Sequence, residues 1–184
     1  PPRSTLFPCR RLFGCAVRAT GSWDGRVALW TVDRDGKDTW FNPKSGAVRA
    51  ISFIPSMVVT IATATYDGRV HLYDLASEQH TITFDQHLTT PIGHLSFSPD
   101  GKKMITADQR GVLKLWRAGV VGTVMGSLNG HHRAITSAAF HPQHQNSVVT
   151  GSVDATTRHW SIPDEEGAHV GAIHGAAVLA SVFA

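Results

Sequence analysis

The chain has 184 residues, of which 42% are hydrophobic and 17% are charged, a balance typical of a folded domain and unlike that of a disordered chain. Its formal net charge of +3 is mild, so it indicates a solvated surface or limited contact with nucleic-acid phosphates. Cys9 and Cys15 give neither a disulfide framework nor a metal-binding spacing, so a reducing compartment, cytoplasmic or nuclear, is expected. No apolar run is long enough to span a bilayer, and no secretory signal is evident.

Along the chain, four similar segments end in an aromatic residue at nearly constant spacing. The aromatic residues are Trp30, Tyr73, Trp116 and Trp160, and the steps between them are 43, 43 and 44 residues. The segments are 19–30, 62–73, 105–116 and 149–160. Asp24-Gly25 and Asp67-Gly68 are strong hairpin signals, and Gly111 has the same place in the third segment. Each segment therefore predicts two strands joined by a tight turn, repeated with a fixed period.

A further strand is predicted upstream of each hairpin from the second segment onward. These stretches, 48–55, 92–101 and 135–142, alternate in polarity and reach an aromatic residue followed, after one residue, by proline. Short apolar strips at 80–84 and 123–128 supply a fourth strand. Four short antiparallel strands per period of this length are typical of β-propeller blades, so the predicted fold class is all-β.

The residues at these positions resemble the WD-repeat family over about residues 5–184. The fourth unit matches the family pattern most fully, with Gly130-His131, then Ser152 and Asp154, then Trp160. In that family, the histidine, hydroxyl, aspartate and tryptophan form a buried hydrogen-bond network that stabilises the blade. The resemblance implies this structural role for His131, Ser152, Asp154 and Trp160.

The other three units keep only part of this pattern. The first retains Ser22, Asp24 and Trp30, and the second retains Thr65, Asp67 and Tyr73, with Lys44 near the place of the histidine. The third has His87, but Arg110 stands where the aspartate is expected, although Asp108 is close by. We therefore expect one complete network, two partial ones and a third unit that is less rigid or that turns Arg110 toward a partner.

The predicted domain is a single β-propeller segment covering 1–184. Its blades are expected at about 5–41, 46–84, 90–128 and 133–173, with the start of a fifth at about 174–184. WD-repeat propellers usually close with about seven blades, so three interpretations stay open. The chain is part of a longer protein with a larger ring, it completes a ring with another chain, or it closes alone as a small ring.

No catalytic, metal or cofactor site is expected from the sequence. His131, Ser152 and Asp154 form a Ser-His-Asp set on paper, but the recurrence of the pattern in other units favours the structural network. The histidines at 131–132 and 141–144 flank a strand and are about 20 Å or more apart, too far to share one metal ion. No phosphate-cradling loop is present, and no small-molecule substrate is indicated.

Binding is therefore the predicted function. In WD-repeat proteins, the loops that lead into each blade and the turns after the second strand share one face. The residues expected there are Trp23, Tyr66, Gln109, Arg110, Arg133 and Val153, and aromatic residues and arginine are frequent interface anchors. We expect a non-catalytic scaffold that binds other proteins in a multisubunit assembly, with no membrane insertion. The alternative is a subunit of an RNA-containing assembly (ribosome biogenesis, splicing or ribosomal) in which Arg3, Arg10, Arg11 and Arg18 contact RNA.

Overall fold

The protein is seen in a computed structural model whose regular secondary structure is β-strand throughout the part described. The described residues are 5–6, 10–12, 15–31, 39–41, 46–55, 60–75, 79–85, 87, 89–118, 123–162 and 171–175. Residues 176–184 of the expected fifth blade, together with Arg3, Cys9 and Lys44, lie outside this set. In the described part, no helix is long and apolar enough to cross a membrane.

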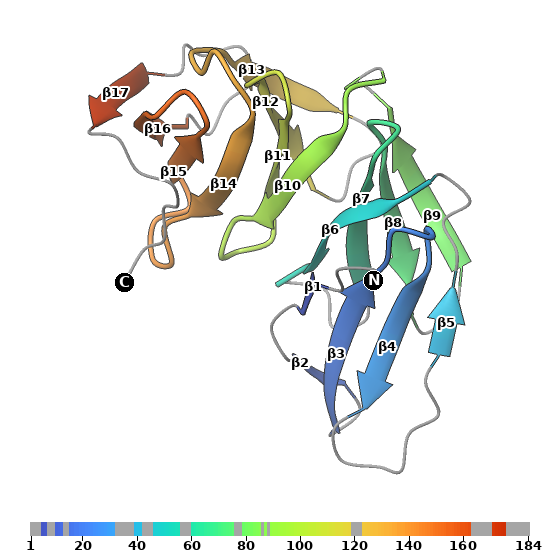
Figure 1. The fold of residues 1–184 in the computed structure, drawn as a ribbon. Coiled ribbons are helices and arrows are strands. Elements are labelled where there is room, and N and C mark those ends of the chain that lie inside the picture. Colours follow the sequence, from blue (N-terminus) through green and yellow to red (C-terminus); the bar gives the residue numbers. More distant parts are fainter. Residues whose placement is uncertain are drawn as a thin grey trace.

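Within the described residues, seventeen strands form four antiparallel sheets (Figure 1). The first sheet contains β1 (Thr5–Leu6), β2 (Arg10–Leu12), β3 (Cys15–Gly21), β4 (Val27–Thr31) and β5 (Thr39–Phe41). Its order is β1-β3-β4-β5, and β2 also pairs with β3. The second sheet has the order β6 (Val48–Phe53), β7 (Thr60–Thr65), β8 (Val70–Asp74) and β9 (Gln79–Phe84).

The third and fourth sheets repeat the arrangement of the second. The third contains β10 (Ile92–Phe97), β11 (Lys103–Asp108), β12 (Leu113–Arg117) and β13 (Val124–Leu128) in that order. The fourth contains β14 (Ile135–Phe140), β15 (Ser147–Ser152), β16 (Thr157–Ser161) and β17 (Gly171–Gly175) in that order. His174 pairs with Arg158 across β17 and β16, so residues 174 and 175 belong to the fourth sheet.

The turn between the second and third strands of each blade needs one residue in the left-handed region. Gly25, Gly68 and Gly111 supply it, with φ of 83°, 83° and 87°, and in the fourth sheet Ala155 has φ 64°. Glycine adopts this conformation without a steric cost, which is why Asp-Gly pairs predict these hairpins well. Ala155 shows that backbone pairing on either side is strong enough to hold a less suitable residue in the same turn.

The four sheets lie side by side as an open arc, and three hydrophobic cores fill the spaces between neighbours (Figure 1). Each core takes one face from each of two consecutive sheets. Tyr73 packs in the core shared with the first sheet, Trp116 in that shared with the second and Trp160 in that shared with the third. Trp116 and Trp160 are each 1% exposed, whereas Trp30 of the first sheet is 40% exposed. In the second, third and fourth blades, the closing aromatic residue thus packs against the blade before it.

Candidate functional site

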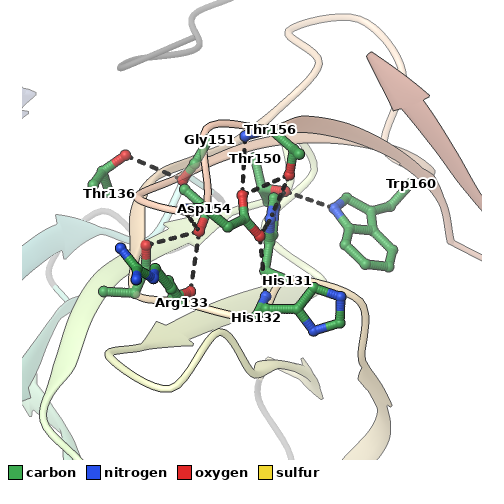
Figure 2. Close-up of polar contacts among 11 residues, drawn as sticks. His131, His132, Arg133, Thr136, Thr150, Gly151, Asp154, Thr156 and Trp160 are labelled. Carbon is green, nitrogen blue, oxygen red and sulfur yellow. Dashed lines mark hydrogen bonds and ion pairs between the residues drawn. The ribbon is translucent and has the colours of Figure 1, made fainter. Parts of the chain in front are cut away.

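A buried hydrogen-bond network ties the fourth blade together (Figure 2). His131 Nδ1 lies 2.9 Å from Asp154 Oδ2, and His131 Nε2 lies 2.8 Å from Thr150 Oγ1. Trp160 Nε1 donates to the same Thr150 oxygen at 2.8 Å, and the His132 backbone N–H donates to Asp154 at 3.0 Å. The network therefore connects the loop leading into the blade with its second and third strands.

The partners of His131 define its proton positions. A carboxylate only accepts, so Nδ1 carries the hydrogen toward Asp154, and Nε2 accepts from the Thr150 hydroxyl. Burial lowers the pKa of His131 in spite of the Asp154 charge, which favours this neutral form. Burial acts to raise the pKa of Asp154, but hydrogen bonds from Thr156, the His132 N–H and His131 outweigh it and keep that pKa below its usual value. The pair is thus a neutral imidazole beside an ionised carboxylate.

The hydroxyl that joins this network is Thr150, and not Ser152 as the family pattern suggested. Ser152 Oγ donates instead to the carbonyl oxygens of Arg133 and Ala134, each at 3.0 Å, and accepts from the Asp154 N–H at 3.1 Å. Ser152 therefore anchors the turn to the incoming strand. Both residues lie on the same face of β15, but Ser152 lies beyond Gly151, the last residue paired with β16, whereas Thr150 lies within the paired part, closer to Trp160.

The third blade has a full network as well, which does not fit the alternative of a less rigid third unit. His87 Nδ1 lies 3.1 Å from Asp108 Oδ2, and Nε2 lies 2.6 Å from Thr106 Oγ1. Trp116 Nε1 donates to Thr106 at 2.8 Å. Asp108, two residues before the expected position, supplies the carboxylate, and Arg110 is exposed. Burial opposes ionisation of Asp108, but bonds from His87 and the Val112 N–H keep its pKa below the usual value.

The first two blades keep smaller sets of bonds. In the first, Trp30 Nε1 donates to Thr20 Oγ1 at 3.0 Å, while Asp24 accepts the Arg26 N–H at 3.0 Å and its N–H faces Ser22 at 3.4 Å. In the second, the Thr65 hydroxyl contacts Asp67, and Tyr73 replaces tryptophan. Burial raises the pKa of Tyr73 to about 12.

Thr63 is the second-blade counterpart of Thr20, Thr106 and Thr150. Its hydroxyl is buried and has no hydrogen-bond partner among the described residues. The repeated threonine, ten residues before each closing aromatic, was available in the sequence as the signal for the network hydroxyl.

These buried sets have no geometry for catalysis. Thr150 and Thr106 are both 0% exposed, and their oxygens already bond to a histidine and a tryptophan. A nucleophile needs access to its substrate, which neither hydroxyl has. Across the described residues, no three histidine, cysteine, aspartate or glutamate side chains gather in a way that could hold a metal ion.

An exposed aromatic cluster lies on the turns of the first two blades. Trp23 is 53% exposed and Tyr66 is 49% exposed, and their ring centroids are 6.2 Å apart with the planes tilted by 44°. The guanidinium carbon of Arg49 lies 5.2 Å from the Trp23 ring centroid, within cation–π range. We call Trp23, Tyr66 and Arg49 the aromatic cluster. Arg49 had no sequence signal, because only the tertiary structure brings it to Trp23.

Backbone contacts between blades hold this cluster in place. The Val48 N–H donates to the Ser22 carbonyl at 3.0 Å, so the turn of the first blade meets the start of β6. The Tyr66 N–H donates to the Ala47 carbonyl at 2.9 Å. The pairing of β6 with β7 shifts register between Val48 and Ala50, which leaves Arg49 at a bulge. The aromatic cluster is therefore fixed by bonds from both neighbouring turns.

The other residues predicted for this face are also exposed. Arg110 and Arg133 are exposed, and a Cβ on Gly111 would lie 2.7 Å from the Arg133 carbonyl, so the third-blade turn abuts the fourth-blade loop. We call Arg110 and Arg133 the arginine pair. Gln109 is exposed and Val153 is 50% exposed at the equivalent positions of their blades.

The repeat, the four-stranded sheets and the buried histidine–aspartate–threonine–tryptophan sets define a WD-repeat β-propeller. The chain belongs to the nucleolar protein 10-like N-terminal domain family, whose sequence profile matches residues 14–163.

Three curated relatives show the same kind of similarity. The chain is 28% identical over 162 residues to periodic tryptophan protein 2 homolog of Caenorhabditis elegans, covering 88% of this chain and 17% of that protein. It is 22% identical over 157 residues to periodic tryptophan protein 1 homolog of Drosophila melanogaster, covering 84% and 34%. It is 27% identical over 143 residues to DNA damage-binding protein 2 of Mus musculus, covering 73% and 32%. The chain thus spans about a third or less of the length of these relatives.

Proposed function

We propose that this propeller segment is a non-catalytic scaffold that binds another protein in a multisubunit assembly. The binding surface is the face formed by the loops leading into the blades and the turns between their second and third strands, which we call the turn face. The observation that supports it is the aromatic cluster, two half-exposed rings with an arginine beside them on a rigid edge. Large aromatic residues with arginine are the side chains most often found at the energetic centre of protein interfaces. Membership of a family named for a nucleolar protein favours a nuclear, and specifically nucleolar, location.

The test is affinity capture of partners by the full chain carrying Trp23→Ala or Tyr66→Ala, made singly, with captured proteins identified by mass spectrometry. We expect each variant to lose most of the captured partner, because truncating an interface anchor costs about 2 kcal/mol or more of binding free energy, about thirtyfold in affinity. The melting temperature should change little, since both rings are half-exposed.

A matched control is Lys102→Ala. Lys102 is exposed and directly precedes β11, whereas the turn that this blade contributes to the turn face follows the other end of β11, after Asp108. The Lys102→Ala variant should capture the same partners, in the same amounts, as the unaltered chain does. Capture that survives both aromatic substitutions, or that is lost only in proportion to a fall in melting temperature, would count against a binding role for this face.

An RNA-containing assembly is the second candidate. It is favoured by the family's nucleolar description and by the exposed arginines of the turn face. The same capture, run with and without ribonuclease, separates the two candidates. Partners that remain after ribonuclease treatment support the protein scaffold, and partners that are released support attachment through RNA.

A further inference from the structure

The charges of the turn face narrow the chemistry of its partner, if the proposed function holds. Five arginines lie on the turns, in the loops leading into the blades or at the bulge that opens β6, at positions 26, 49, 69, 110 and 133. Two are neutralised locally, because Arg26 and Arg69 reach Asp24 and Asp67 at 3.7 Å and 3.1 Å. Among the described residues, Arg49, Arg110 and Arg133 have no carboxylate within ion-pair distance.

The carboxylates on the turns of the third and fourth blades are bound within the buried networks, and Asp85, in the loop leading into the third blade, is exposed. Asp108 and Asp154 are bound by His87 and His131 in the buried networks. Each also accepts backbone N–H groups, so neither side chain is available to neutralise the arginine pair. The face therefore presents an apolar aromatic surface next to excess positive charge.

The distance between the aromatic cluster and the arginine pair follows from the spacing of the blades. The aromatic cluster lies where the first and second blades meet, and the arginine pair lies where the third and fourth meet. Packed sheets are about 10 Å apart, so two blade steps separate the features by about 20 Å. An extended peptide advances about 3.3 Å per residue and covers that distance in about six residues.

We propose that the turn face binds an acidic peptide segment in an extended conformation. One apolar side chain of the peptide packs on Trp23 and Tyr66, and acidic residues about six positions away bind Arg110 and Arg133. Arg49, stacked on Trp23, receives a carboxylate that flanks the apolar anchor.

The test uses synthetic peptides in a Ser/Asn/Gly background, labelled with fluorescein and followed by anisotropy against the full chain. Each peptide has one leucine and a Glu-Glu pair, separated by about three, six or nine residues. We expect the six-residue spacing to bind most tightly. Replacing Glu-Glu by Gln-Gln should weaken it by about fivefold to tenfold, as expected for two exposed charge contacts.

A charge reversal on the protein makes the assignment specific. The double variant Arg110→Glu/Arg133→Glu should lose the preference for Glu-Glu. It should also bind a matched peptide that has Lys-Lys in place of Glu-Glu better than the unaltered chain does. Both side chains are exposed, so its thermal melt should match that of the unaltered chain. The control Lys102→Glu, at the opposite end of β11 from Arg110, should keep the original preference for Glu-Glu.

Three outcomes would overturn the proposal. They are affinity independent of the glutamates, a preference unchanged by the double variant, and displacement of the peptide by a uridine oligonucleotide that binds more tightly and needs the same arginines. These results leave the proposed scaffold function standing if Trp23→Ala still abolishes partner capture. If Trp23→Ala instead keeps both partner capture and peptide binding, the binding role of the turn face is itself refuted.

Discussion

At the scale of single residues, a threonine on the second strand decides how well each blade is bonded. Thr106 and Thr150 each meet a histidine and a tryptophan, which satisfies every polar atom of a buried set. In the second blade, tyrosine replaces tryptophan, and Thr63 keeps a buried hydroxyl without a partner among the described residues. A buried unpaired hydroxyl has a desolvation cost, whereas a paired one contributes to stability.

We therefore predict opposite results for the same substitution in two blades. Thr63→Val should leave the free energy of unfolding unchanged or raise it by up to about 1 kcal/mol, because valine has the same shape and needs no partner. Thr150→Val should lower it by about 1–3 kcal/mol, because His131 and Trp160 each lose a bond. Denaturant titration of both variants measures the two values. Equal destabilisation of both would show that the Thr63 hydroxyl has a partner.

At the scale of the element, the same turn recurs in four blades with different side chains at its left-handed position. Glycine occupies it in three blades, and the fourth has Ala155, which is exposed. An alanine held in this conformation lowers the folding stability by about 1 kcal/mol relative to glycine. Part of that loss is offset, because glycine has more conformational entropy in the unfolded chain.

Ala155→Gly should accordingly stabilise the chain by about 0.5 kcal/mol, seen as a small rise in melting temperature. The reciprocal change, Gly111→Ala, should destabilise by more than about 1 kcal/mol. An alanine at position 111 would be held in the left-handed region at φ 87°, and its Cβ would lie 2.6 Å from the His131 carbonyl oxygen. If Ala155→Gly lowers the melting temperature, local strain does not decide the stability of this turn.

At the scale of the whole molecule, the blades depend on one another, because each core is made from the faces of two sheets. The contact of Phe84 with Trp116, at 5.1 Å between ring centroids, shows how the outer strand of one blade covers the tryptophan of the next. Stability in such repeats is shared through neighbour contacts, so a weakened blade also weakens its neighbours.

Acid should destabilise the assembled blades. Burial lowers the pKa of His131 and of His94, each below the ordinary value of 6.5, so below that pH the unfolded chain binds protons that the native state does not. The resulting stability is present above about pH 6.5 and is lost as the pH falls through the native pKa values. The lowered pKa values of Asp108 and Asp154 extend the loss to lower pH, below the ordinary value of 3.8.

Thermal melts from about pH 7.5 down to pH 4 measure this effect. We expect the melting temperature to fall steadily below about pH 6.5, and His131→Gln to reduce that slope. His144→Gln, at an exposed histidine, is the control and should keep it. A melting temperature that stays constant across this range would contradict the assignment of a neutral, buried His131.

The repeat period, the Asp-Gly turns and the closing aromatics were enough to predict the four-stranded sheets, because strand alternation and turn chemistry are local properties. The family pattern also indicated His131 and Asp154 as partners. It placed the hydroxyl at Ser152 rather than Thr150. It also placed the third-blade carboxylate at position 110, with Asp108 noted only as close by. In both cases the two candidates are two residues apart, so the strand period of two does not distinguish them. The contacts with His131 and His87 in the folded chain decide between them.

Only the tertiary structure decided what the chain presents to a partner. Trp23, Tyr66 and Arg49 come from two different sheets, and backbone bonds between neighbouring blades bring them together. Likewise, Trp30 and Trp116 occupy equivalent places in the repeat, yet they are 40% and 1% exposed, because among the described residues a neighbouring sheet packs on Trp116 and none packs on Trp30. The sequence by itself determined the blade, since a blade follows from contacts near in the chain. The surface and the cores were decided by packing between blades, which depends on contacts that no single repeat contains.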